Sequence, residues 1–179
     1  MTRRRFIAVA KVVLLLVIAV ALQTLLISRV SILGVTADLF LVFTVVVAVS
    51  RGSLDGAVFG FVAGVVADVA FLQPLGVRAL VYVLAGYSVG MLVSRFGSIN
   101  PWAVFLVAGG ASFFAQLLFG LFQFMMGPRA GFLTMFVTQI LPEAVLDALV
   151  AVPIYALLVR LQVLPASGAE PRGTRRAAE

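Results

Sequence analysis

The chain has 179 residues, of which 63% are hydrophobic and 11% charged, with a formal net charge of +6. Its apolar runs are too long and too numerous for a soluble core of this size, so composition predicts a polytopic membrane protein with no room for a soluble catalytic domain. It contains no cysteine and no histidine, which excludes disulfides and thiolate metal sites and removes the commonest general base.

The predicted elements begin with an apolar segment from Phe6 to about Ser28. This segment is longer than the hydrophobic region of a signal peptide, and no small-residue cleavage site precedes the next span, so we expect a retained first transmembrane helix. A second span, LFLVFTVVVAVS, opens at Asp38 and closes at Ser50. It is short for a membrane crossing, and a re-entrant segment is the alternative.

A glycine stripe marks the third predicted helix, which runs from about Leu54 to Leu72. Residues four apart share one face of a helix, and small residues at that spacing let another helix approach closely in lipid. We interpret the stripe as a helix-packing surface whose partner is either in this chain or in another protein. Asp68 takes the next place in the series, which consists of Gly52, Gly56, Gly60 and Gly64.

The fourth predicted helix runs from Val77 to about Ser94, after turn residues at positions 73–76. It carries its own small-residue pair, Gly86 and Gly90. Because both helices present small residues at the same spacing, we expect the third and fourth helices to pack side by side as a tight hairpin.

A fifth helix is predicted from Trp102, an amphipathic residue suited to the membrane interface, to about Met126. Ser112, Gln116 and Gly120 share one face of it. We expect this polar face to be turned toward protein and not toward lipid, because interhelical hydrogen bonds are the partners available to such groups in a bilayer.

The sixth span is predicted from Pro142 to Leu161, because proline at the first position followed by Glu143 is a common helix start. The preceding segment 132–141 is either an interfacial helix or the first part of one long kinked helix. The polar tail 164–179 is expected to be disordered.

Charge distribution predicts the orientation in the membrane. With six spans and both termini in the cytoplasm, ten basic residues lie inside and three outside, as the positive-inside rule requires. The sequence therefore predicts an all-α polytopic membrane bundle of about six transmembrane helices in a single domain, residues 1–163, followed by the basic cytoplasmic tail. We read the net charge as orientation and contact with membrane lipid, and not as nucleic-acid binding.

Polar and ionisable residues within the spans are the candidate functional sites, and under this topology they lie in the outer half of the bundle. Each charge costs about 2.5–3.5 kcal/mol at mid-depth, so these side chains should face protein or water. One interpretation is a polar pocket or relay, and the other is a structural network in which Arg78 neutralises Asp68 across the hairpin. The Gly-x-Gly-Asp signature of intramembrane aspartyl proteases is absent. The set comprises Asp68, Arg78, Gln139, Glu143 and Asp147.

The block GFVAGVVADVAFLQPLGVRALVYVLAGY resembles the signature of the rod shape-determining protein MreD family, in its Gly-Phe, its membrane aspartate and its Leu-Gly-x-Arg before an aromatic helix. The resemblance extends over nearly the whole chain, from LQTLLIS in the first helix to VPIYALLVRL in the last. The chain departs from the family pattern at Ala37, where proline is usual, and at Asp147, where asparagine is expected.

The resemblance implies a non-enzymatic scaffold subunit of the elongasome in the bacterial inner membrane, without cofactor or metal. The implied partners are MreC and, through it, MreB, the glycosyltransferase RodA and a class B penicillin-binding protein. MreD-like bundles also look similar to the S-components of energy-coupling-factor vitamin transporters, so a substrate-binding transporter subunit is the alternative, and a lipid-binding module is a third. A closed outer cavity lined by aromatics would favour the transporter.

Overall fold

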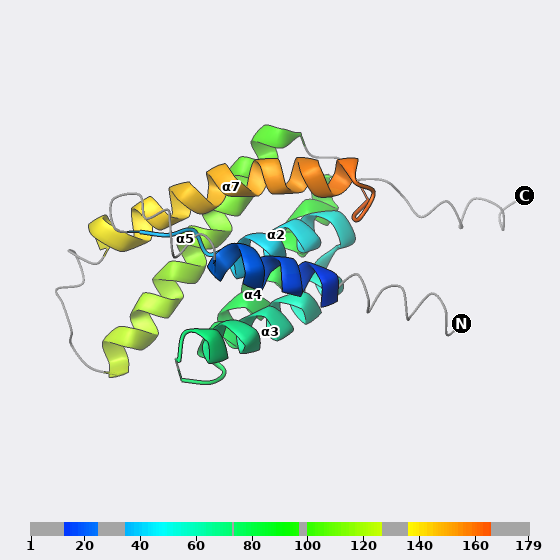
Figure 1. Ribbon diagram of the computed structural model, residues 1–179. Helices are drawn as coiled ribbons and strands as arrows, with labels where there is room; N and C mark the ends of the chain where they lie inside the picture. Colours follow the sequence, from blue (N-terminus) through cyan, green and yellow to red (C-terminus); the bar gives the residue numbers. More distant parts are fainter. Residues whose placement is uncertain (1–12, 25–34, 73, 97–99, 127–135, 166–179) are drawn as a thin grey trace, which may run out of the picture.

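The computed structural model describes residues 13–24, 35–72, 74–96, 100–126 and 136–165. Within these residues the fold is an all-helical bundle, as predicted (Figure 1). Its elements are helix Val13–Thr24, α2 (Leu39–Arg51), α3 (Ser53–Ala70), α4 (Val77–Phe96), α5 (Pro101–Met126), the π-helical turn η1 (Phe136–Ile140) and α7 (Leu141–Arg160).

Four helical units in the described part are long and apolar enough to cross a membrane: α3, α4, α5 and η1 together with α7. The last two join without a break, so residues 136–160 form one helical unit and not a separate interfacial helix. Residues 132–135 lie outside the described residues. So do the ends of the predicted first helix and most of the tail, residues 166–179.

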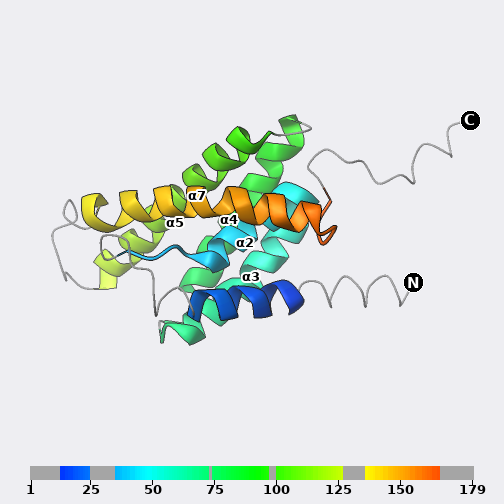
Figure 2. The same cartoon turned by 45° about the horizontal axis from the view of Figure 1, so that its top comes forward.

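The short helix α2 lies at the centre of the bundle. Every residue from Leu39 to Val49 is buried, and Figures 1 and 2 show the other helices arranged around it. A run that is apolar on all sides is typical of an enclosed helix, and the hydroxyl of Thr44 donates to the Phe40 carbonyl at 2.7 Å within the helix itself. With 13 residues, α2 is about 20 Å long. It is therefore shorter than the hydrocarbon layer of about 30 Å, and its amino end lies inside the protein.

The glycine stripe of α3 packs inside this chain, against α4 and α2. A Cβ at Gly56 would lie 2.5 Å from the Ala48 Cβ and 2.8 Å from the Gly86 carbonyl oxygen. A Cβ at Gly60 would overlap the main chain of Tyr82. Because only hydrogen fits at these positions, the predicted hairpin of the third and fourth helices is a backbone-to-backbone contact.

The same contact continues toward both ends of the hairpin. A Cβ at Gly64 would meet the main chain of Ala79, and one at Gly90 would meet the main chain of Ser53. Gly52 was predicted to be a packing glycine, but the structure gives it a different role. A Cβ there would have no atom within 4 Å, and its φ of 95° is what allows the chain to turn from α2 into α3.

The two ends of the bundle are different. The start of helix Val13–Thr24 and the end of α7 lie at the same end, on the right in Figures 1 and 2. At the opposite end, α5 and η1 reach farther than the turn between α3 and α4. The amino end of α2 points toward this second end, and α5 and α7 extend beyond it (Figures 1 and 2).

Candidate functional site: a polar cluster at the amino end of α2

The amino end of α2 needs hydrogen-bond acceptors, because the first N–H groups of a helix have no partner within it. Asp38 is 4% exposed and its Oδ1 accepts the Leu41 N–H at 3.2 Å. The amide of Gln23, from the first described helix, accepts the Leu39 N–H at 2.8 Å. Asp147 Oδ1, from α7, accepts the Asp38 N–H at 2.7 Å. Three segments that are distant in sequence therefore meet at one helix end.

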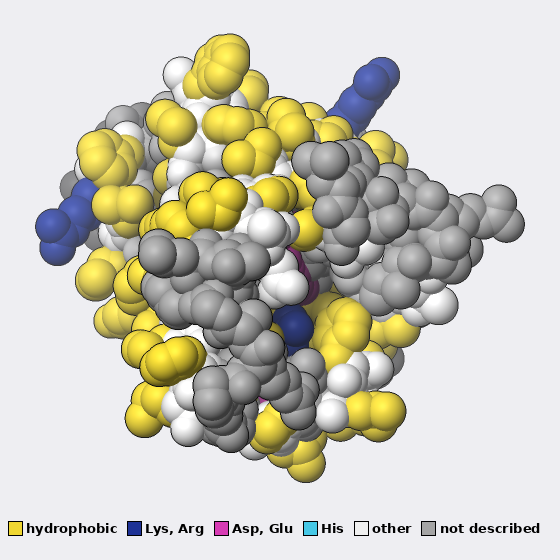
Figure 3. Space-filling model, turned by 90° about the vertical axis from the view of Figure 1, so that its left-hand side faces the viewer, with side chains coloured by type: hydrophobic (Ala, Val, Ile, Leu, Met, Phe, Trp, Pro, Cys, Tyr) yellow, Lys and Arg dark blue, Asp and Glu magenta, His cyan; other side chains and the backbone are white. Residues whose placement is uncertain are grey.

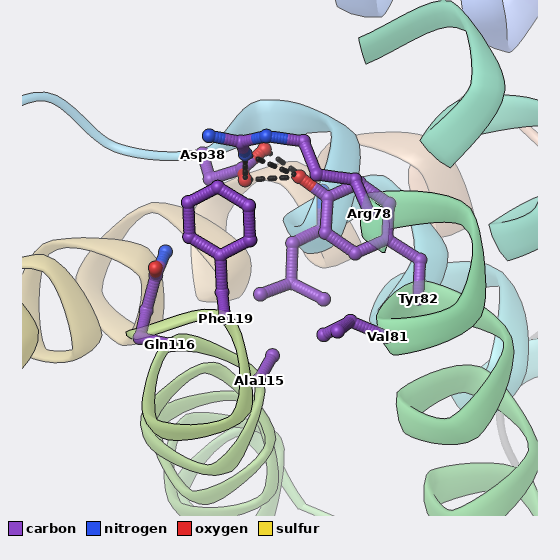
Figure 4. Close-up of a pocket in the computed structure, with 8 residues that line it drawn as sticks. Asp38, Arg78, Val81, Tyr82, Ala115, Gln116 and Phe119 are labelled. Atoms are coloured by element: carbon purple, nitrogen blue, oxygen red, sulfur yellow. Dashed lines mark hydrogen bonds and ion pairs between the residues drawn. The ribbon is translucent and has the colours of Figure 1, made fainter. Parts of the chain in front are cut away.

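Arg78 provides the cation of this cluster. Its Nη1 donates to Asp38 Oδ2 at 2.9 Å and to the Tyr82 hydroxyl at 3.0 Å, and the Tyr82 hydroxyl donates to the same Asp38 oxygen. The guanidinium carbon lies 4.8 Å from the ring centroid of Phe71 and 4.5 Å from that of Phe119. Figure 4 shows the side chain reaching from α4 across to Phe119 on α5. The cation is thus held by one carboxylate and two aromatic faces.

The predicted ion pair between Asp68 and Arg78 is wrong. Asp68 is fully buried, and its Oδ2 accepts the Gly76 N–H at 2.7 Å while its Oδ1 accepts the main-chain N–H of Arg78 at 3.2 Å. The prediction rested only on the similar depth of the two side chains in the membrane. The turn, with Gly76 at φ 100°, places main-chain N–H groups beside Asp68, so this carboxylate caps the start of α4. The Arg78 guanidinium therefore pairs with Asp38 and not with Asp68.

The polar face of α5 is turned toward protein, as predicted, and the neighbour there is α7. The Ser112 hydroxyl donates to Asp147 Oδ2, and the Gln116 amide donates to Glu143 Oε1 at 2.6 Å. Gln139 does not join them, because its side chain is exposed. The four-residue spacing from Gln139 to Glu143 assumed regular α-helix, whereas Gln139 lies in the π-helical turn, where wider winding rotates it off that face.

Sequence reasoning missed several members of the cluster. Tyr82 follows Arg78 by four residues, which places both on one face of α4 and was a usable signal. Asp38 was recognised as a helix start but not as the counter-ion of Arg78. Gln23 and Phe119 had no local signal, because their roles depend on which helices become neighbours.

A small pocket lies between α4 and α5 beside the cluster. Its volume is about 190 Å³ including the part that is open to the surroundings, and the enclosed part is about 10 Å³, which is room for about one water molecule. Figure 3 shows basic and acidic side chains side by side in a hollow on this end of the bundle, with hydrophobic side chains around it. The pocket is lined by Asp38, Leu41, Arg78, Val81, Tyr82, Ala115, Gln116 and Phe119.

Among the described side chains, no group of three or more His, Cys, Asp or Glu residues could hold a metal ion. What the described groups can do is bind one another.

The chain matches a known protein family. The family model described as rod shape-determining protein MreD matches residues 3–163. No curated protein and no solved structure matches the chain.

Proposed function

The chain belongs to the rod shape-determining protein MreD family, and from this premise we propose that it is a non-enzymatic scaffold of the bacterial elongasome. Membership itself supports a membrane protein that determines cell shape. The proposal adds that the chain lies in the inner membrane with both termini in the cytoplasm. It further holds that the chain couples MreC and MreB to lateral peptidoglycan synthesis.

The observation that carries the proposal is the cluster at the amino end of α2. Asp38, Arg78 and Asp147 use their polar atoms on one another and on main-chain groups, which joins α2, α4 and α7. Groups that are bound in this way fix the relative positions of helices, and a membrane subunit that must present a constant surface to its partners needs such fixing. A substrate-binding site would instead present polar groups to an open cavity.

The transporter alternative requires a cavity larger than the observed pocket. A vitamin-binding subunit similar to the S-components needs an outer cavity that encloses its substrate. The enclosed space of about 10 Å³ has room for about one water molecule, so the scaffold has the stronger physical support.

Affinity purification of the full-length chain from membranes of its native host tests the proposal. We expect MreC to be enriched most directly, with MreB, RodA and a class B penicillin-binding protein recovered through it. Depletion of the chain should convert rods to round cells, and the wild-type gene should restore the rod. Recovery of a transporter ATPase module in place of MreC, with normal rods after depletion, would reject the scaffold.

A further inference from the structure

Asp147 is a buried carboxyl group that forms no ion pair with any cation in the described part of the chain. It is fully buried on α7. Its Oδ1 accepts the Asp38 N–H at 2.7 Å, and its Oδ2 is hydrogen-bonded to the Ser112 hydroxyl. The guanidinium of Arg78 pairs with the Asp38 carboxylate instead. An ionised carboxylate that is enclosed without a counter-ion is so costly that such a group takes up a proton.

The titratable groups around Asp147 make a charge on it still less favourable. Asp38, at the start of α2, carries the charge that pairs with Arg78 on α4. The Tyr82 hydroxyl, also on α4, donates to the same Asp38 oxygen. Glu143 lies one helical turn before Asp147 on α7. Among the described residues of this cluster, a single cation therefore faces three carboxyl groups, and ionisation of all three would leave an excess of negative charge.

The hydrogen-bond partners of Asp147 are those that a protonated carboxyl group needs. Such a group has an oxygen that accepts and an O–H that donates. The Asp38 N–H can only donate, and it faces Oδ1. The Ser112 hydroxyl, which faces Oδ2, can accept as well as donate. A proton on Oδ2 therefore satisfies both contacts, and it leaves the serine hydrogen for a carbonyl of its own helix.

Asp68 provides a contrast within the same chain. It is equally buried, but its Oδ2 and Oδ1 face the main-chain N–H groups of Gly76 and Arg78. Both of these partners can only donate, so both oxygens must accept. The amino end of α4, which Asp68 caps, also favours a negative charge. Two fully buried carboxyl groups thus differ in one respect, because only Asp147 has a partner that can accept a hydrogen.

We propose that Asp147 is a proton-binding site: its carboxyl group is protonated in the folded protein, and the bound proton forms the hydrogen bond from Oδ2 to Ser112. The hydrogen of that contact then belongs to Asp147, and the serine oxygen accepts it. The proton joins α7 to α5, while Oδ1 joins α7 to the start of α2. This site is independent of the partners that the chain has in the membrane.

Infrared difference spectroscopy of the full-length protein at neutral pH tests the proposal, because the C=O stretching band of a protonated carboxyl group is separate from the bands of a carboxylate. We expect this band in the wild-type protein, its loss in Asp147→Asn and its retention in Asp68→Asn. Glu143→Gln is measured in parallel, so that a band from Glu143 is not assigned to Asp147. A protonated carboxyl band of equal intensity in the wild-type protein and Asp147→Asn would overturn the proposal.

Thermal unfolding of the same two variants gives an independent test. Asparagine has the shape of a protonated aspartic acid, with a C=O that accepts and an N–H that donates. Asp147→Asn should therefore keep both contacts and the wild-type unfolding midpoint. Asp68→Asn places an amide N–H against a main-chain N–H, and should lower the midpoint by about 3–6 °C. A midpoint of Asp147→Asn that falls as far as that of Asp68→Asn, or a failure of Asp147→Asn to fold, would refute the proton site.

Discussion

Asp38 shows how a single residue joins separate elements. Its carboxylate caps α2 and pairs with Arg78, and its own N–H donates to Asp147. In a poorly hydrated place each of these groups would be costly alone, because neither water nor lipid replaces the missing partner. The Asp38 carboxylate is therefore bound to the main chain of α2 as well as to Arg78, and removing either charge affects both α2 and α4.

A double-mutant cycle tests this coupling. Asp38→Asn and Arg78→Gln should each lower the free energy of unfolding, and the double variant should recover about 1–3 kcal/mol of the summed loss, because it leaves no unpaired charge. Unfolding in mixed micelles provides the measurement. The pair of a half-buried Arg51 and an exposed Asp55, at 3.7 Å, is the matched control, with an expected coupling of about 0.3–0.5 kcal/mol. A coupling no larger than that of the control would contradict the prediction.

At the scale of elements, the hairpin of α3 and α4 depends on glycines that contact main chain and not flexible side chains. Gly60 faces the Tyr82 carbonyl, and Gly86 faces the main chain of Gly56. A carbonyl group cannot move aside without shifting its whole helix, so an added methyl group separates the two helices. Gly110 on α5 has nothing within 4 Å of an added Cβ and lies in an equally regular helix.

Alanine substitutions separate these two situations. Gly60→Ala and Gly86→Ala should each destabilise the protein by about 1–3 kcal/mol through overpacking. Gly110→Ala should be neutral or stabilise it by up to about 1 kcal/mol, because alanine is the better helix former. Unfolding midpoints of the three variants give the comparison. If all three behave alike, helix propensity decides and close packing does not.

At the scale of the whole molecule, the described part of the chain begins and ends on one side of the bundle, which is the arrangement that the predicted six-span topology requires. The start of helix Val13–Thr24 and the end of α7 lie at one end of the bundle (Figure 1). The enclosed α2 departs from a simple picture of equal spans, since its length of 13 residues is too short for the hydrocarbon layer. Neighbouring helices, and not lipid, cover it on all sides.

Reporter fusions test the orientation. A reporter after Glu179 should be cytoplasmic, and one inserted in the loop from Gly127 to Gly131 should be external, because most arginines then lie inside. Both positions lie outside the described residues. The test therefore depends on the charge distribution and the number of predicted spans, and not on side-chain contacts. Activity of both reporters on one side of the membrane would reject the six-span topology.

The sequence by itself determined the helices and the hairpin. Periodicity placed α3 beside α4 through Gly56, Gly60 and Gly64, and it turned Ser112 and Gln116 toward protein, because residue spacing along one regular helix is a local property. The start of α4 follows from the turn residues before it, which are also local, and α5 begins at Pro101, one residue before the predicted start at Trp102.

Only the tertiary structure decided how the polar residues pair. Asp68 was the predicted partner of Arg78, and the observed pairing with Asp38 depended on a turn that brought N–H groups to Asp68 and on the depth at which the short α2 begins. Gln139 left its expected face because a π-helical turn changed the winding locally. Hydrogen bonds require distances of about 3 Å, and sequence spacing does not fix the position of one helix relative to another with that precision.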